Sequence, residues 1–240
     1  MHSLVILTLI LANPTQVQAN PPTRLLFVGN SYTYSNDLPV LVQTLYVAAK
    51  LPQPEIEQIM MGGAALGDHW RNPRTTQRLI NGKWNYIVMQ QGPSSLASSQ
   101  KEFLADMEKA KPWLKQSGAK PAMFMVWPDT SRRKYFPQVR NAYADAARSV
   151  DGIFIPAGLA WQDLLSKHPS MELYSGDGLH PTPLGTYIAA IVIVSRLTGL
   201  PPERFPTSIR WSGQYQVTLS KDQVESVLDA VRLALKDAGK

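Results

Sequence analysis

A carboxylate and an imidazole lie three residues apart near the C-terminal end of the chain. They are Asp177 and His180, within residues 177–182, Asp-Gly-Leu-His-Pro-Thr. In a tight turn, side chains at this spacing can share one hydrogen bond. The carboxylate then fixes the tautomer of the ring and stabilises its charged form, which leaves the other ring nitrogen free to accept a proton. The spacing therefore predicts a general base, His180, oriented by Asp177.

A base of this kind needs a group to deprotonate, and Ser31 is the candidate. It follows an apolar run, Leu25 to Val28, in the order Gly29-Asn30-Ser31. A serine hydroxyl is a weak nucleophile until a neighbouring base takes its proton. The two halves of such a pair would come from opposite ends of the chain, so the fold must bring them together.

Each of these residues also has a simpler interpretation. A serine after a strand commonly caps a helix or a turn. The Asp-x-x-His pair could stabilise its own turn, or could supply two metal ligands. A metal site needs further donors, and His69 and His168 lie in stretches without ligand spacing.

Composition limits the possible functions. The chain has 240 residues, of which 44% are hydrophobic, enough for one substantial domain with a closed core. The formal net charge is +6, but the basic residues are scattered, and the one tight run, residues 132–134, has no nucleic-acid motif beside it. We therefore expect no nucleic-acid partner. The absence of cysteine excludes disulfides, thiolate catalysis and cysteine-ligated metals.

The first segment has the pattern of an export signal. Residues 3–12 form an apolar run too short to span a bilayer, and residues 17–19, Val-Gln-Ala, supply a small-x-small cleavage site. We expect a signal peptide over residues 1–19, and an exported chain, periplasmic or extracellular, in which residues 20–240 form a single domain. An uncleaved anchor and a buried core segment are the alternatives. The rest of the chain is too polar for a membrane span.

From Thr23 onward, short apolar runs alternate with helical patterns. This alternation predicts an α/β fold with a parallel sheet covered by helices on both faces. The predicted strands are 25–28, 55–61, 86–89, 122–126 and 153–155, and the predicted helices are 37–50, 99–115, 135–150, 184–197 and 220–236. We expect Asp37 to cap the first helix, and a capping box to start the last one. Residues 201–219 stay ambiguous and could form a loop with a short edge strand.

Polar and glycine-bearing segments follow the first three predicted strands. They are Gly29-Asn30-Ser31, Gly62-Gly63 and Gln90-Gln91-Gly92. In parallel sheets, sites form at the carboxyl ends of the strands. Gly62-Gly63 alone could be an ordinary turn, and the two glutamines a satisfied polar pair. Their occurrence at successive strand ends favours an active site.

This order of blocks, closed by Asp-Gly-x-His-Pro, resembles the SGNH (GDSL-type) hydrolases over nearly the whole chain after residue 19. The Asp-Gly-x-His-Pro block is the most specific element of the resemblance. The family consists of esterases and lipases with a flavodoxin-like, three-layer α/β/α fold, so the resemblance implies that fold around a five-stranded parallel sheet. It also implies roles for the quoted residues: Ser31 as nucleophile, His180 as base and Asp177 as its orienting acid.

The resemblance further implies three donors to the oxyanion that forms when an ester carbonyl is attacked. The first two are the backbone N–H groups of Ser31 and of a second-block glycine, Gly63 with Gly62 as the alternative. The third block departs from the family pattern, because Gly-x-Asn is replaced by Gly92-Pro93-Ser94. We expect the amide of Gln91 to replace the asparagine, with Gln90 as the fallback because neighbouring strand residues point to opposite sides.

These observations favour an exported serine esterase that needs no metal or organic cofactor. Its expected substrate is a small-molecule or carbohydrate ester with a short acyl group, such as acetyl. Tyr32 and Tyr34, with Trp70 or Trp127, could form a wall on which a sugar stacks. The alternatives are a lipid-ester hydrolase, a metal-dependent hydrolase and a non-catalytic carbohydrate-binding or interaction module on the same fold. The altered third block favours the last. The sequence does not indicate an oligomeric state.

Overall fold

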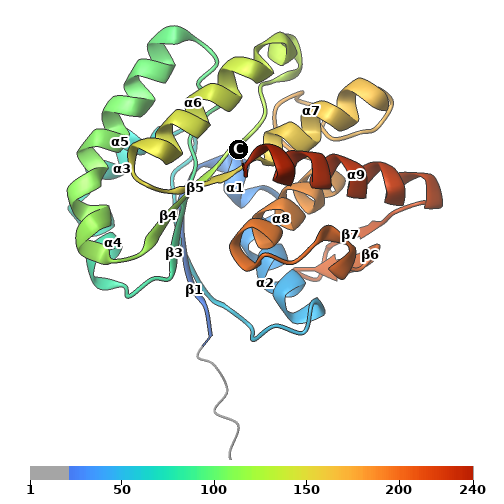
Figure 1. The fold of residues 1–240 in the computed structure, drawn as a ribbon, viewed down its shortest axis with the longest axis horizontal. Coiled ribbons are helices and arrows are strands. Elements are labelled where there is room, and N and C mark those ends of the chain that lie inside the picture. The colour runs from blue at the N-terminus through green and yellow to red at the C-terminus, as the bar shows by residue number, and fades with distance from the viewer. Residues whose placement is uncertain (1–21, 240) are drawn as a thin grey trace, which may run out of the picture.

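The computed structural model describes residues 22–239, so the signal peptide predicted over residues 1–19 lies outside the described residues. At its centre is a five-stranded sheet with the order β2-β1-β3-β4-β5, in which all neighbouring strands are parallel (Figure 1). The strands are β1 Arg24–Gly29, β2 Glu55–Met60, β3 Tyr86–Met89, β4 Lys120–Phe124 and β5 Ile153–Ile155. All five predicted strands are confirmed, with shifts of at most two residues at either end.

Helices cover both faces of this sheet, which makes the fold a three-layer α/β/α sandwich (Figure 1). One layer contains α3, α4, α5 and α6, and the other contains α2, α7, α8 and α9. The helices are α1 Ser31–Tyr34, α2 Leu38–Ala48, α3 Leu66–Trp70, α4 Pro73–Asn81, α5 Ala97–Ser117, α6 Phe136–Ser149, α7 Ala157–Lys167, α8 Pro183–Thr198 and α9 Lys221–Asp237. The strand order 2-1-3-4-5 is that of flavodoxin-like folds.

The residue types of the strands match their burial in the sheet. Leu25 to Val28 in β1 are completely buried, because β1 has a strand on each side and a helix layer on each face. The edge strand β2 instead has exposed or half-buried positions throughout, including Glu55 and Glu57. These carboxylates pair with Arg24 and Arg78. Charged side chains on an edge strand discourage pairing with another chain.

The structure differs from the sequence-based expectation in the N-cap of α2. Asp37 precedes α2, but its backbone is left-handed, with φ 51°, and its side chain makes no capping hydrogen bond. The prediction that Asp37 caps this helix is wrong. The predicted capping box at Ser220 is confirmed, because its hydroxyl accepts from Gln223 N–H and the Gln223 side chain accepts from Ser220 N–H.

The elements that were not predicted include helix α7 and a hairpin in residues 201–219. Helix α7 places the apolar positions 157, 160, 161, 164 and 165 on one buried face, a helical spacing that the sequence already contains. The ambiguous residues 201–219 form a short turn and an antiparallel hairpin, β6 Ser208–Trp211 and β7 Tyr215–Thr218. The hairpin packs beside α2 and α8, outside the main sheet (Figure 1).

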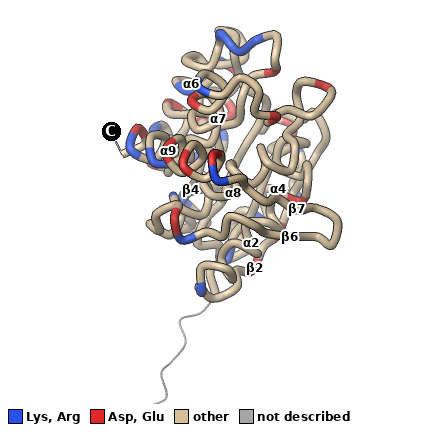
Figure 2. The backbone as a smooth tube through the Cα atoms, turned by 90° about the vertical axis from the view of Figure 1, so that its right-hand side faces the viewer, with Lys and Arg blue, Asp and Glu red and all other residues tan. Residues whose placement is uncertain are grey.

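Charges are distributed over the surface as the sequence suggests. Figure 2 shows acidic and basic segments interspersed along the outer helices on the face that it presents. Among residues 22–239, no helix combines the length and the apolar character that crossing a membrane requires.

Candidate active site

The segments after β1, β2 and β3 meet at one edge of the sheet, where a cleft of about 470 Å³ opens. Its walls include Ser31, Gly63, Gln91 and Ser94. Strand β1 lies between β2 and β3, so the three loops come together at the carboxyl ends of adjacent strands. In open α/β sheets, ligands bind at such a point, where the strand order reverses.

Ser31 is the first residue of the short helix α1, and Asn30 caps that helix. The Asn30 side chain accepts a hydrogen bond from Tyr32 N–H at 3.1 Å. Its amide donates to the carbonyl of Ala64 at 2.9 Å, which connects this loop to the loop after β2. Ser31 itself is half-buried on the cleft wall. Asn30 therefore has a structural function that its position in the first block did not reveal.

Gln90 is buried beneath the Ser31 loop and stabilises it. Its carbonyl oxygen accepts from Asn30 N–H at 3.1 Å and from the Thr33 hydroxyl at 2.8 Å. Its amide nitrogen donates to Asn30 Oδ1 at 2.9 Å and to the carbonyl of Gln91. All of the donor and acceptor groups of the Gln90 side chain are thus used within the protein, which leaves none for a ligand.

Gln91, the next residue, projects to the other side of the strand and lines the cleft. Its carbonyl oxygen accepts from Leu66 N–H at 3.1 Å, and its amide nitrogen donates to Ser94 Oγ at 2.8 Å. Between the two glutamines, the structure thus places Gln91, the expected donor, at the cleft and Gln90, the fallback, beneath it.

Gly63 lies on the cleft wall with φ 70°, a left-handed conformation that favours glycine. An added Cβ would meet no atom within 4 Å, so the requirement for glycine comes from the backbone and not from crowding. Gly62, in contrast, faces the hydroxyl of Tyr34. Among the described residues, neither Ser31 N–H nor Gly63 N–H donates a hydrogen bond.

Asp177 and His180 form the predicted hydrogen bond. His180 Nδ1 lies 2.5 Å from Asp177 Oδ2. The other oxygen, Asp177 Oδ1, accepts from the Ser175 hydroxyl and from the backbone N–H groups of Leu179 and His180, at 2.8 to 2.9 Å. These bonds, first of all the one with the His180 ring, hold the pKa of the Asp177 carboxyl well below its usual range. Asp177 is therefore an anion at neutral pH and favours a proton on Nδ1.

The other ring nitrogen of His180, Nε2, is buried and has no hydrogen-bond partner among the described residues. Its ring lies against that of Tyr32, the neighbour of Ser31, with the ring centres 6.2 Å apart. No hydrogen bond joins Ser31 to His180 in the part of the chain that the structure describes. Catalytic hydrogen bonds are often long without substrate and shorten when it binds.

Asn36 and Trp127 position the Asp-His loop. Asn36, five residues after Ser31, donates through its amide to the Pro181 carbonyl and to the Thr186 hydroxyl, both at 2.8 Å. Trp127, after β4, donates from its indole nitrogen to the carbonyl of Leu179 at 3.1 Å. The sequence analysis did not predict this role for either residue, because each acts on groups far away in the chain.

No family model matches the sequence, and no curated protein matches it, whereas many solved structures resemble the fold. A proposed SGNH hydrolase from Slackia heliotrinireducens superposes with a TM-score of 0.64 at 24% identity, covering 74% of this chain and 100% of that one. The chain has the SGNH hydrolase fold. A DUF4886 family protein from Bacteroides uniformis superposes with a TM-score of 0.69 at 19% identity, covering 92% and 97%. An acetyl xylan esterase from Geobacillus stearothermophilus gives 0.52 at 15%, covering 73% and 92%.

The aromatic residues of this SGNH fold do not form the expected sugar-stacking wall. Trp127 is completely buried and stacks on Trp161, with ring centres 3.5 Å apart. Trp70 and Tyr32 are also buried, at 7% and 4% exposure. The interpretation of Trp70 and Trp127 as stacking residues is therefore wrong, since both belong to the core. Tyr34, exposed beside Gly62, is the aromatic residue of this group that solvent reaches freely.

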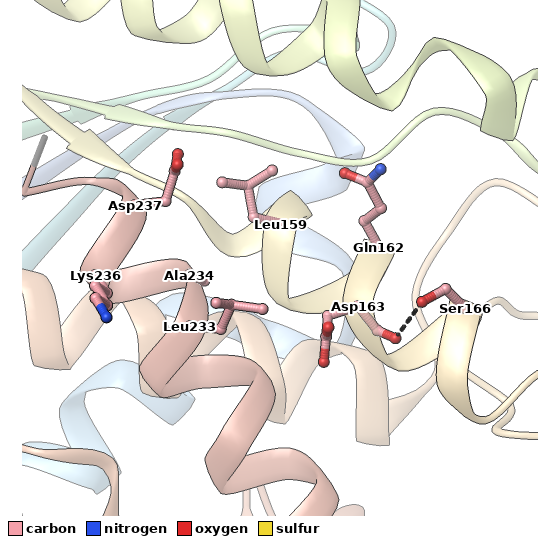
Figure 3. A pocket seen from close by; sticks show the side chains of 8 residues that line it. All are labelled: Leu159, Gln162, Asp163, Ser166, Leu233, Ala234, Lys236 and Asp237. Carbon is pink, nitrogen blue, oxygen red and sulfur yellow. Dashed lines mark hydrogen bonds between the residues drawn. The ribbon is translucent and has the colours of Figure 1, made fainter.

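A second hollow, of about 440 Å³, lies between α7 and α9 (Figure 3). Its wall includes Leu233 and Asp163, and Asp163 is paired with Lys167. The hydrogen bond drawn in Figure 3 joins the Ser166 hydroxyl to the Asp163 carbonyl and belongs to the helix itself. The two hollows are similar in volume, so the chemistry of the walls distinguishes them: only the cleft brings together residues of the three strand-end loops of the SGNH fold.

A metal site of three or more histidine and acidic side chains is not found among residues 22–239. The buried His69, in α3, serves a different purpose. Its Nε2 is 3.1 Å from the carbonyl of Gly29, directly before the Ser31 loop, and burial lowers the pKa of the ring. His69 is thus a neutral donor to the end of β1.

Proposed function

We propose that this chain is a serine esterase that hydrolyses carboxylic esters through an acyl-enzyme. The observation that supports it most is the Asp177–His180 hydrogen bond of 2.5 Å, which leaves Nε2 without a partner beside the loop that carries Ser31. The resemblance of the chain to SGNH hydrolases, in fold and in the order of its blocks, supports the same assignment.

In the proposed mechanism, His180 Nε2 takes the proton of the Ser31 hydroxyl, and Ser31 Oγ bonds to the ester carbonyl carbon. The tetrahedral intermediate collapses as His180 returns the proton to the leaving alcohol. Water then attacks the acyl-enzyme in the same way and releases the acid. Asp177 remains an anion throughout and stabilises the imidazolium.

The oxyanion would be bound by three N–H groups of cleft-lining residues that have no acceptor within residues 22–239: Ser31 N–H, Gly63 N–H and one amide hydrogen of Gln91. Such donors are most effective when they are oriented before the substrate arrives. Removing one of them is expected to raise the barrier by about 3 kcal/mol. Gln91 in this role would replace the missing asparagine of the third block.

The walls of the cleft favour a short acyl group and a polar alcohol. Besides Ser31, Gly63 and Gln91, the lining contains small residues, two leucines, Leu96 and Leu179, and the charged side chains of Glu102, Asp106, Asp129 and Arg132. A long acyl chain would need a more apolar lining. Carboxylates and guanidinium groups instead bind hydroxyls, so acetyl esters of carbohydrates fit best. The similar structure from Geobacillus stearothermophilus is described as an acetyl xylan esterase.

We further propose that the chain is exported after cleavage behind Ala19. The basis is the apolar run at residues 3–12 and the small-x-small site that follows. Intact-mass analysis of the protein recovered from the periplasm or medium of an expressing bacterium tests this. A mass beginning at Asn20 is expected, and a full-length chain retained inside the cell would contradict it.

The proposed activity is tested by exposing the protein to a fluorophosphonate and measuring its intact mass together with p-nitrophenyl acetate turnover. A single adduct on Ser31 with loss of turnover is expected. Ser31→Ala and His180→Ala should abolish turnover while the protein stays folded. Ser35→Ala is the matched control. Ser35 lies four residues after Ser31, directly behind α1, and its hydroxyl makes no hydrogen bond within residues 22–239.

The other outcomes identify the alternatives. An active Ser31→Ala variant would contradict the assignment, and loss of activity with a chelator would indicate a metal-dependent hydrolase. If neither adduct nor turnover is found in folded protein, a non-catalytic binding module is the better description. Rates with p-nitrophenyl esters of increasing acyl length separate a short-chain esterase from a lipid-ester hydrolase: we expect the rate to fall beyond short chains.

A further inference from the structure

The orientation of the Gln91 amide is determined by the hydrogen bonds around it. The backbone N–H of Leu66 can only donate, so the atom 3.1 Å from it must be the carbonyl oxygen of the Gln91 side chain. The amide nitrogen therefore points the other way, to Ser94 Oγ at 2.8 Å. That nitrogen has two hydrogens and this one bond, so within the described residues its second hydrogen has no acceptor.

The backbone of Gln91 is fixed as well. The hydroxyl of Tyr143, which is completely buried, donates to the Gln91 carbonyl at 2.5 Å and accepts from Gln91 N–H at 3.2 Å. The backbone and the carbonyl oxygen of the side chain are thus held by Tyr143 and Leu66. The remaining freedom is the tilt of the NH₂ group, and Ser94 is the residue that constrains it.

Ser94 occupies a conformation that serine adopts at a cost. Its φ is 55°, in the left-handed region, and its side chain is buried, with 6% of the residue exposed. Glycine would adopt this backbone without strain. Its hydroxyl is 3.4 Å from the carbonyl of Gly92, to which it can donate while its oxygen accepts from Gln91. Strained residues of this kind cluster at functional sites.

We propose that Ser94 is a positioning residue: its hydroxyl holds one amide hydrogen of Gln91 so that the other is directed at the oxyanion. This inference rests on the proposed esterase function. It also explains the altered third block. Ser94, at the position of the family's asparagine, does not donate to the oxyanion itself. It orients Gln91, which does. A preorganised donor lowers the barrier more than one that must reorient during the reaction.

The test is the substitution Ser94→Gly, which removes the hydroxyl and the backbone strain together. The melting temperature should stay equal or rise, because glycine fits the left-handed backbone. The kcat for p-nitrophenyl acetate should fall about 10-fold or more with little change in KM, since an oxyanion donor acts in the transition state. If Ser94 had a purely structural role, kcat would not fall while the melting temperature stays equal or rises.

Two further variants make the test specific. Gln91→Ala should lower kcat by about 10² to 10³, and adding Ser94→Gly to it should have no further effect, because the residue being positioned is gone. Lys83→Gly is the control, since Lys83 is an exposed residue with φ 52° before β3 and does not line the cleft. It should change stability in the same direction and leave kcat unaltered.

An unchanged kcat in Ser94→Gly would overturn the inference, as would additive effects of Ser94→Gly and Gln91→Ala. Fluorophosphonate labelling of Ser31 in the unaltered protein is measured in parallel. If the unaltered protein is labelled and turns over substrate, but Ser94→Gly has an unchanged kcat, only the role of Ser94 is rejected. Absence of both labelling and turnover would reject the proposed function and this inference with it.

Discussion

The Asp177 carboxylate illustrates how single residues tune this site. It is about half exposed, with 49% of its side chain accessible, yet its pKa is held well below the usual range. The cause is the number of donors that converge on it, led by the His180 ring, and not burial. An exposed turn can thus supply a permanently ionised orienting group, because four hydrogen bonds stabilise its charge and little burial opposes it.

This lowered pKa predicts a pH dependence of stability. A carboxyl whose pKa is lower in the folded protein stabilises it above the unfolded pKa, about 4, and loses that contribution as the pH falls further. The free energies of unfolding of wild type and Asp177→Asn should therefore differ at pH 7, and the difference should shrink steadily as the pH falls below about 4. Urea unfolding across this range measures it. A difference that stays constant with pH would contradict the assigned cause.

Asp177→Asn should also reduce turnover at pH 7. Its amide nitrogen would meet Nδ1 of His180 and favour the wrong tautomer of the ring. We expect kcat for p-nitrophenyl acetate to fall by several orders of magnitude, while the backbone bonds to the remaining side-chain oxygen preserve the turn. A variant with near-normal kcat would show that Asp177 only stabilises its loop.

At the scale of elements, the site depends on how the strand ends are connected to each other. Asn30 bonds to Ala64, Gln90 to Asn30, and Gln91 to Leu66 N–H, so the loops after β1, β2 and β3 form one hydrogen-bonded unit. The buried His69 of α3 adds a further bond to Gly29 at the end of β1. Because burial keeps this histidine neutral, the stability of the unit should decrease in mild acid.

We predict that His69 makes the protein sensitive to mild acid. Its pKa is lower in the folded than in the unfolded protein, so the unfolded chain binds more protons as the pH falls below about 6.5, and stability decreases there. The slope is at most about 1.4 kcal/mol per pH unit for one proton. His69→Gln, whose amide can donate to Gly29, should show a shallower acid loss in unfolding measurements. Parallel curves for the two proteins would refute this.

At the scale of the whole molecule, the C-terminal hairpin contributes to the site from outside the main sheet. The indole nitrogen of Trp211 in β6 donates to the carbonyl of Asn36 at 2.6 Å. Asn36 in turn bonds to Pro181, the neighbour of His180. Residues 201–219, ambiguous in the sequence, thus stabilise the connection between the two ends of the chain that carry Ser31 and His180.

Trp211→Phe tests this connection, because it keeps an aromatic ring but removes the indole donor. We expect a loss of about 1–3 kcal/mol in the free energy of unfolding, since the Asn36 carbonyl loses its partner, and a lower kcat for p-nitrophenyl acetate. Tyr215→Phe in the same hairpin is the control, because no hydrogen bond of its hydroxyl is present among the described residues. Equal effects of the two substitutions would exclude a specific role of the indole.

The sequence by itself determined the strands, the sheet type and the Asp177–His180 bond, because apolar periodicity and a three-residue spacing are local properties. Only the tertiary structure decided which glutamine faces the cleft, that Trp127 is core, and that Asn36 and Trp211 support the His180 loop. These depend on contacts between residues far apart in the chain, for which no local pattern exists. Helix α7 is an intermediate case. The helical spacing of its apolar residues was present in the sequence, but their burial comes from packing against α8 and α9.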